Sequence, residues 1–284
     1  MKNKLVISAS VVVASLFVGC GGGSSSDGGS SGNFLTGNPV TVTTPQEATN
    51  AMSSVTTLNT LGTGSVSPSS ARTASPSLAP VNESGSCVDG GSYSIDGDAS
   101  DTTANLTTVY TNCSQYGSTM NGKQHIEGTN DGTTVNLDMT MTALSQSSSI
   151  GSSTMDMSIK YILNNATNVL DMTMNGTASF DYSSPVSNAG SAGYEDFRVV
   201  ADNATNTLTI NGDVSTTSSA HSCVDGRYHL ETTQILVPGV NGFSSGQMKI
   251  NGATFDFHND GTATVTFADG STNIVTQGAE VVCN

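Results

Sequence analysis

Apolar and polar residues alternate through the second half of this chain, and this period of two constrains the fold more than any other feature. From 135 to 143, Val, Leu, Met, Met and Ala occupy the odd positions, while Asn, Asp and Thr occupy the even ones. The alternation recurs at 155–163, 170–174, 208–210, 248–250, 255–257 and 265–267. Strands that bury one face of an antiparallel sheet show this pattern. It predicts roughly nine to eleven strands between residue 86 and the end of the chain.

The breaks between the alternating runs carry turn chemistry. Asn130-Asp131-Gly132, Asp260-Gly261 and Asp269-Gly270 are suited to tight hairpins, and the similar segments NNATN at 164–168 and DNATN at 202–206 predict two longer turns. Strands joined by short turns lie beside their sequence neighbours. We therefore expect a mainly β fold, an antiparallel meander that forms a strongly curved sheet or an open barrel.

One helix is predicted before the strands. Thr44 is a suitable N-cap, Pro45 takes the first helical position, and Glu47 completes a capping box. Apolar residues then follow at helical spacing until Gly62 (Ala48, Met52, Val55, Leu58 and Leu61). This spacing predicts an amphipathic helix over about 45–61, within a 44–62 segment that packs on the sheet. Residues 63–85, rich in Ser and Pro, are predicted to be a linker.

Two short sequences recur in the chain. SCVDG occurs at 86–90 and at 222–226, each time ahead of a predicted strand that contains Tyr93 or Tyr228. Met-Asn-Gly or Ile-Asn-Gly occurs four times, beginning at Met120, Met174, Ile210 and Ile250, and is predicted to end a strand each time. The repeats suggest that the domain at 86–284 is a diverged duplication, with units at 86–221 and 222–284.

The amino terminus has the organisation of an export signal. Two lysines within MKNK precede the apolar run LVISASVVVASLFV, which ends at Gly19-Cys20. This order resembles the lipobox of bacterial lipoproteins, a resemblance confined to residues 1–20. It implies that 1–19 is a signal peptide and that Cys20 carries the lipid, typically including palmitate. It also implies outer-membrane sorting, because Gly21 rather than Asp follows Cys20. Residues 20–43 would then be the lipidated cysteine and a Gly/Ser tether.

The charge of the chain limits its partners. Removal of 1–19 leaves six basic and 23 acidic residues, a net charge of −17. Nucleic acids and anionic headgroups attract Lys and Arg, so the composition argues against both as partners. The expected partners are the membrane, through the lipid on Cys20, and an envelope protein, a glycan or an apolar ligand.

Four cysteines remain besides Cys20, and an even count in an exported chain predicts disulfides. Three connectivities are open. If the two units are copies, each SCVDG cysteine pairs within its own unit, which gives Cys87–Cys113 and Cys223–Cys283. A zinc site is disfavoured, since the chain contains no Cys-x-x-Cys motif.

Other chemical signals are weak. Gly242-Phe-Ser244-Ser-Gly246 matches a nucleophile elbow, but an alternating run follows where that motif requires a helix. Asp96, Asp98 and Asp101 form a calcium candidate, against which we favour a polar turn after a strand at 93–95. The four histidines lack the short spacing of a metal site.

These observations predict a lipid-anchored protein of the cell envelope, expected in the outer membrane, with a non-catalytic binding or structural role and no required cofactor. The alternative is a carrier or chaperone of lipids or other apolar ligands. It rests on the inward methionines at 139, 141, 155, 157, 172 and 174, which would line a half-barrel. A hydrolase that uses Ser244 or a carboxylate pair is the third and weakest hypothesis.

Overall fold

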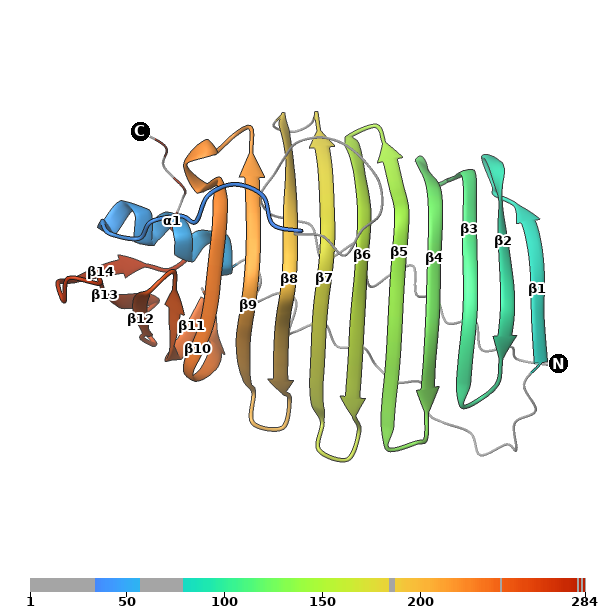
Figure 1. The fold of residues 1–284 in the computed structure, drawn as a ribbon. Helices are drawn as coiled ribbons and strands as arrows, with labels where there is room; N and C mark the ends of the chain where they lie inside the picture. Colours follow the sequence, from blue (N-terminus) through green and yellow to red (C-terminus); the bar gives the residue numbers. More distant parts are fainter. Residues whose placement is uncertain are drawn as a thin grey trace.

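A single antiparallel sheet organises the protein (Figure 1). The computed structural model describes residues 34–56, 79–183, 187–240, 242–279, 281 and 283. Its fourteen strands follow one another in chain order from β1 to β14, and the sheet is not closed. The strands are β1 Ala79–Ser86, β2 Gly90–Ala99, β3 Thr103–Gln115, β4 Ser118–Asn130, β5 Thr134–Ser148, β6 Gly151–Asn164, β7 Val169–Tyr182, β8 Asn188–Asp202, β9 Thr207–Ser218, β10 Gly226–Gly239, β11 Gly242–Ile250, β12 Ala253–Phe257, β13 Thr262–Thr266 and β14 Thr272–Thr276.

The expected meander is confirmed, with more strands than the nine to eleven predicted. Strands β1 to β9 lie side by side in one broad layer, and β10 to β14 turn out of that layer at the C-terminal end (Figure 1). The two longer turns close alike: Asn164 Oδ1 accepts the N–H groups of Ala166 and Thr167, and Asp202 Oδ1 accepts those of Ala204 and Thr205. Such Asx turns explain why the two similar pentapeptides end strands.

One face of the sheet forms the core. Its buried side chains make one contiguous cluster that runs from β5 to β14 and includes Phe197, Ile210 and Phe255, all fully buried. The methionines predicted to point inward do so: Met141, Met155, Met157, Met172 and Met174 are 2–7% exposed, and Met139 packs against them. The alternation in the sequence is therefore the alternation between the two faces of the sheet.

The predicted helix begins where the sequence indicates. Helix α1 spans Pro45–Thr56, and the rest of the 45–61 prediction lies outside the described residues. Glu47 N donates to Thr44 Oγ1 at 3.3 Å, and Thr44 N donates to Glu47 Oε2 at 3.0 Å, so the capping box is formed. Ala48, Ala51 and Met52 are buried against the C-terminal end of the sheet, where α1 contacts β11, β14 and the short 3-10 helix η2 (Ser222–Val224).

The Met-Asn-Gly and Ile-Asn-Gly tripeptides do not all end strands. Those beginning at Met120, Met174 and Ile210 lie within β4, β7 and β9, and only the one beginning at Ile250 ends a strand. At each of the three, the asparagine Oδ1 accepts a backbone N–H from a β-bulge in an adjacent strand: Asn121 from Asn112, Asn175 from Asp196, and Asn211 from Thr232. The tripeptide marks a bulge in the adjacent strand, which bends and twists the sheet.

Two segments predicted to be unstructured belong partly to the fold. Residues 79–85, assigned to the linker, form most of edge strand β1. Residues 34–43, assigned to the tether, cross the sheet: Val40 N donates to Arg227 O at 2.9 Å, and Thr36 N donates to Ser215 Oγ at 3.1 Å. The cause is pairing with distant strands, which a local reading of composition does not detect.

Candidate binding surface

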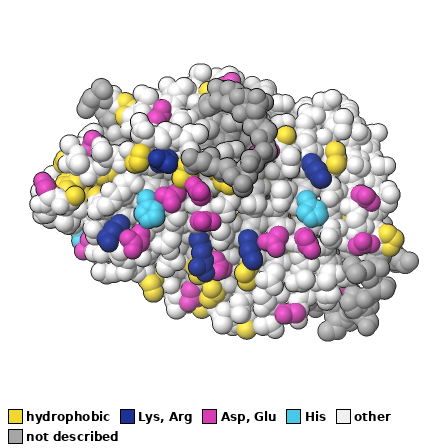
Figure 2. Space-filling view, in the orientation of Figure 1, with side chains coloured by type: hydrophobic (Ala, Val, Ile, Leu, Met, Phe, Trp, Pro, Cys, Tyr) yellow, Lys and Arg dark blue, Asp and Glu magenta, His cyan; other side chains and the backbone are white. Residues whose placement is uncertain are grey.

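The solvent face of the sheet carries an ordered row of polar side chains. Cross-strand register aligns one residue from each of nine successive strands: Asn105, Glu127, Asp138, Lys160, Thr173, Arg198, Asn211, Glu231 and Lys249. We call this set the polar row. Figure 2 shows basic, acidic and histidine side chains in a band across this view of the molecule. Bulges shift the register between several of these strands, so the sequence alone does not show this alignment.

Ion pairs hold parts of this face in place. Arg198 donates to both carboxylate oxygens of Asp171, at 2.9 and 2.7 Å. That hydrogen bonding, aided by the charges of Arg198 and Lys160, holds the pKa of Asp171 below its ordinary value, although partial burial opposes it. Lys249 and Glu231, adjacent in the polar row, approach to 3.6 Å. Exposed pairs of this kind each contribute roughly 0–1 kcal/mol, so they add little to the stability of the sheet.

The polar row is extended along the sheet and does not converge on a point. Neighbouring strands lie about 4.8 Å apart, so the side chains form a line and do not converge on one point. An active site gathers a nucleophile, a base and a stabilising group around one reacting atom. Across the described ranges, no group of three or more His, Cys, Asp or Glu side chains is placed to hold a metal ion. A line of mixed charges and amides can bind an extended polar partner.

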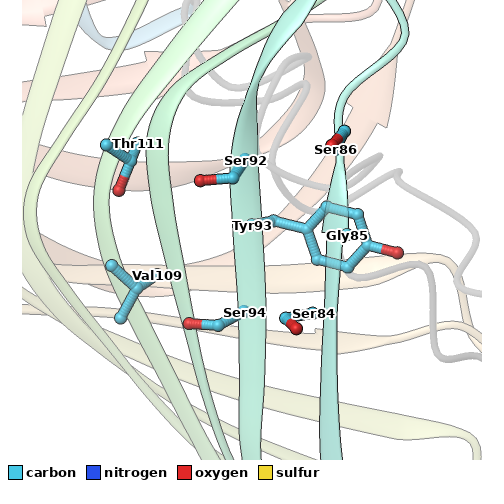
Figure 3. Close-up of a pocket in the computed structure, with 8 residues that line it drawn as sticks. All are labelled: Ser84, Gly85, Ser86, Ser92, Tyr93, Ser94, Val109 and Thr111. Carbon is cyan, nitrogen blue, oxygen red and sulfur yellow. The ribbon is translucent and has the colours of Figure 1, made fainter.

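A hollow of about 350 Å³ lies at the N-terminal edge of the sheet (Figure 3). It forms where small side chains from β1, β2 and β3 meet, and the Tyr93 ring reaches across β1 at Gly85. A Cβ at Gly85 would lie 2.9 Å from Tyr93 Cε1, so glycine is needed for this contact. The hollow is lined by Ser84, Gly85, Ser86, Ser92, Tyr93, Ser94, Val109 and Thr111. Its hydroxyl groups offer hydrogen bonds, and no Asp, Glu, His, Lys or Arg side chain is among its lining residues.

The cysteine pairs are Cys87–Cys113 and Cys223–Cys283, each with a Cα–Cα distance of 5.3 Å. The first joins the β1–β2 turn to β3, and the second joins η2 to the C-terminal residues after β14. Both SCVDG segments precede a strand as expected, since Gly90 begins β2 and Gly226 begins β10. Cys20, the predicted lipidation site, lies outside the described residues.

The aspartates of the calcium candidate are placed differently from the prediction. Strand β2 continues to Ala99, so Asp96 and Asp98 are exposed strand residues, and only Asp101 lies in a turn. That turn closes through Ser100 Oγ, which accepts the N–H groups of Thr102 and Thr103. The strand is longer than predicted because Asp96, Gly97 and Asp98 pair with both β1 and β3.

Ser244 and three of the four histidines make local side-chain hydrogen bonds. Ser244 is on β11, where its hydroxyl donates to Val237 O at 3.2 Å, so the strand-to-helix context of a nucleophile elbow is not present here. Histidine rings pair locally: His125 with Thr107 at 3.0 Å, His229 with Asp213 at 2.9 Å, and His258 with Thr264 at 2.8 Å. These partners tie each of these three histidines to its own or the adjacent strand.

Comparison with known proteins adds no relative. No protein-family model matches the chain, and neither a curated protein nor a solved structure matches it. Among the described residues, no helix has the length and apolar character needed to cross a membrane.

Proposed function

We propose that this protein is a lipid-anchored protein of the cell envelope, placed in the outer membrane, which presents the polar face of its sheet to a polar partner without catalysing a reaction. The observation that carries the proposal is the polar row, a continuous line of charged, amide and hydroxyl side chains across nine strands. The opposite face is occupied by the core, so this row is the broad surface that the sheet offers to solvent.

The chemistry of the surface favours an envelope protein or a glycan as partner. Charges of both signs alternate with Thr and Asn, which suits a partner that offers many hydrogen bonds along an extended strip. Glu127 and Asp138, both exposed, are opposite each other in the register without a basic residue between them. Neighbouring like charges repel in the free protein, and a partner that supplies cations or donors relieves this repulsion.

The carrier hypothesis has less support. A ligand cavity needs apolar side chains that line free space, and the methionines at 141, 155, 157, 172 and 174 are 2–7% exposed within the contiguous core. The hollow in Figure 3 is lined mainly by Ser and Thr and lies away from them. Native mass spectrometry of the purified protein decides between the hypotheses, because a carrier co-purifies with lipid.

Site-specific photo-cross-linking in intact cells tests the proposed function. A photoreactive amino acid at Thr173, in the middle of the polar row, is expected to give a discrete adduct. The same amino acid at Asn165, an exposed residue of the β6–β7 turn, is the matched control and should give none. The absence of adducts from Asn105, Thr173 and Asn211 together would contradict a role for this face.

A further inference from the structure

Three exposed apolar side chains stand in a line at one end of the sheet. Val88, Tyr116 and Ile150 are 71%, 88% and 54% exposed. They occupy the β1–β2, β3–β4 and β5–β6 turns, which lie at the same end because alternate turns of a meander do so. Turns two strands apart are separated by about 10 Å. We call these three side chains the apolar tips.

The backbone of each tip is fixed. Asp89 N donates to Ser114 O at 2.8 Å, and the Cys87–Cys113 disulfide ties the first turn to the strand that leads to the second. Ser183 N, after β7, donates to Ile150 O at 2.9 Å. The apolar side chains therefore project from a rigid edge.

The other end of the same strands has the opposite character. The turns between β2 and β3, β4 and β5, β6 and β7, and β8 and β9 consist of Ser, Asp, Asn, Thr, Gly and Ala. Val240, which is fully exposed, is an exception outside β1 to β6: it lies in the β10–β11 turn, at the same end as these polar turns. Large apolar residues at one end of β1 to β6 and polar residues at the other indicate that the two ends meet different environments.

The fold does not require a tyrosine at position 116. It has φ +51° and is followed by Gly117 at φ +77°, in a two-residue hairpin where Asn or Gly is usual. Five of the seven non-glycine residues with positive φ are Asn or Asp, and only Tyr116 and Ala143 are not. A bulky residue in this conformation costs about 1–2 kcal/mol. A strained and almost fully exposed tyrosine points to a role outside the fold.

We infer that the apolar tips insert into the interfacial region of a phospholipid bilayer with zwitterionic headgroups. Separate, protruding side chains do not form the continuous patch of about 800 Å² that a stable protein partner needs. A lipid surface requires no complementary shape, and tyrosine favours the interface between headgroups and acyl chains. The three tip turns carry no Lys or Arg, and their one acidic residue is Asp89, which excludes attraction to anionic lipid.

The start of the described chain is consistent with this orientation, which rests on the proposed anchor at Cys20. Phe34 lies over Gly193, five residues from the end of β8 that is nearest the tips and nine from its other end. That places it about 17 Å from the tip end and about 30 Å from the polar end. The described chain therefore begins nearer the tip end of the sheet than the polar end.

Insertion of the tips would set the strands upright on the membrane. A 14-residue strand is about 46 Å long, so the polar turns would stand that far from the bilayer. The polar row would then face sideways, free to meet a partner. A lipid anchor keeps the protein at the membrane surface, so the local concentration of the apolar tips at the bilayer is high. Weak insertion of three side chains is then enough to populate the inserted state.

A single tryptophan tests the inference, because the chain contains none. The mature protein with Tyr116→Trp is placed in phosphatidylcholine vesicles, and a matched protein carries Ala166→Trp in the β6–β7 turn at the polar end. Lipids brominated on the acyl chain quench only inserted rings. We expect a blue shift and quenching for Trp at 116 and neither change at 166. Adding Val88→Ser and Ile150→Ser should lower the quenching at 116 at least roughly twofold, since insertion follows the apolar area.

The outcomes separate the orientation from the anchor. Co-flotation of the protein with vesicles without quenching at 116 would overturn the tip insertion while leaving the anchor intact. Equal quenching at both positions would overturn it in favour of a protein lying flat. A blue shift that grows with protein concentration without vesicles would overturn it in favour of a second copy. Tyr116→Asn, which relieves the backbone strain, should fold at least as stably as the parent and remove tip contact.

Discussion

The side-chain carbonyl of Asn175 on β7 accepts the backbone N–H of Asp196 on β8 at 2.7 Å. Asp196 has φ +47° and is the extra residue of a β-bulge, so its N–H is not used by the regular ladder. Gly176, next to Asn175, has φ +132° and leaves room for the neighbouring backbone. The asparagine of each Asn-Gly pair thus accepts the backbone N–H of a bulge residue in the adjacent strand. The same hydrogen bond recurs at Asn121 and Asn211.

Glycine at 176 should be essential to the sheet. A Cβ there would overlap the carbonyl oxygen of Asp156 and lie 2.6 Å from Met157 Cβ. Gly132 has φ +89° but open space around it, which makes it a matched control. We expect Gly132→Ala to cost about 1 kcal/mol of unfolding free energy and Gly176→Ala about 3 kcal/mol or more, because steric overlap adds to backbone strain. Urea denaturation measures both free energies of unfolding. Equal losses in the two variants would contradict the close contact of Gly176 with Asp156 and Met157.

Tyr194 should make stability fall at alkaline pH. Its ring is 7% exposed and packs edge-on against Phe197, and burial raises the pKa of its phenol to about 12. The unfolded chain loses this proton near the ordinary pKa of 10.0, so the stabilisation is complete below that pH and is lost as pH rises towards about 12. Tyr194→Phe should flatten this part of the stability curve. An unchanged slope in the variant would rule Tyr194 out as its cause.

The hairpin aspartates should make stability fall in acid. Asp131 Oδ1 accepts the N–H groups of Thr134 and Thr133, which lowers the pKa of Asp131, and hydrogen bonds lower those of Asp260 and Asp269. Their contribution is complete above the unfolded pKa of 3.8 and is lost as pH falls through the lower folded values. Asn at all three positions keeps the acceptor without the charge. Denaturation at about pH 6 and about pH 3 should show a smaller loss in the triple variant.

The two disulfides should stabilise by similar amounts and have different local effects. They close loops of 26 and 60 residues, worth about 3–4 kcal/mol each in the chain-entropy model. Cys223→Ala with Cys283→Ala should also free the C-terminal residues, raising hydrogen exchange near β14 and α1. Cys87→Ala with Cys113→Ala should raise exchange in β1 and β2 only. Identical exchange maps for the two double variants would contradict this assignment.

The extent to which sequence predicted this fold follows from the range of the interactions. The Asx turn at Asn164 and the capping box of Thr44 with Glu47 use residues a few positions apart, so their motifs were sufficient. Alternation identified the inward methionines for the same reason. Asn175-Gly176 was misread because its bulge partner, Asp196, is about twenty residues away. Locally, Asn-Gly is a turn signal.

The surface was harder to predict than the core. The polar row depends on the register of nine strands, and each bulge displaces that register, so no local pattern reveals that Lys160 and Arg198 share one line. Edge strand β1 was missed because Ser and Pro dominate the segment before it, and pairing with β2 alone defines it. The cysteine pairs were accessible to sequence only through the repeated SCVDG segment.

Metabolic labelling with palmitate tests the lipid anchor most directly. The parent protein and a Cys20→Ser variant are expressed in a bacterial host, immunoprecipitated and examined for label, and their membrane and soluble fractions are compared. We expect label and membrane retention in the parent, with loss of the label and release of the protein in the variant. A parent protein without label, or a Cys20→Ser protein that still carries it, would contradict the proposal that Cys20 anchors this sheet to the cell envelope.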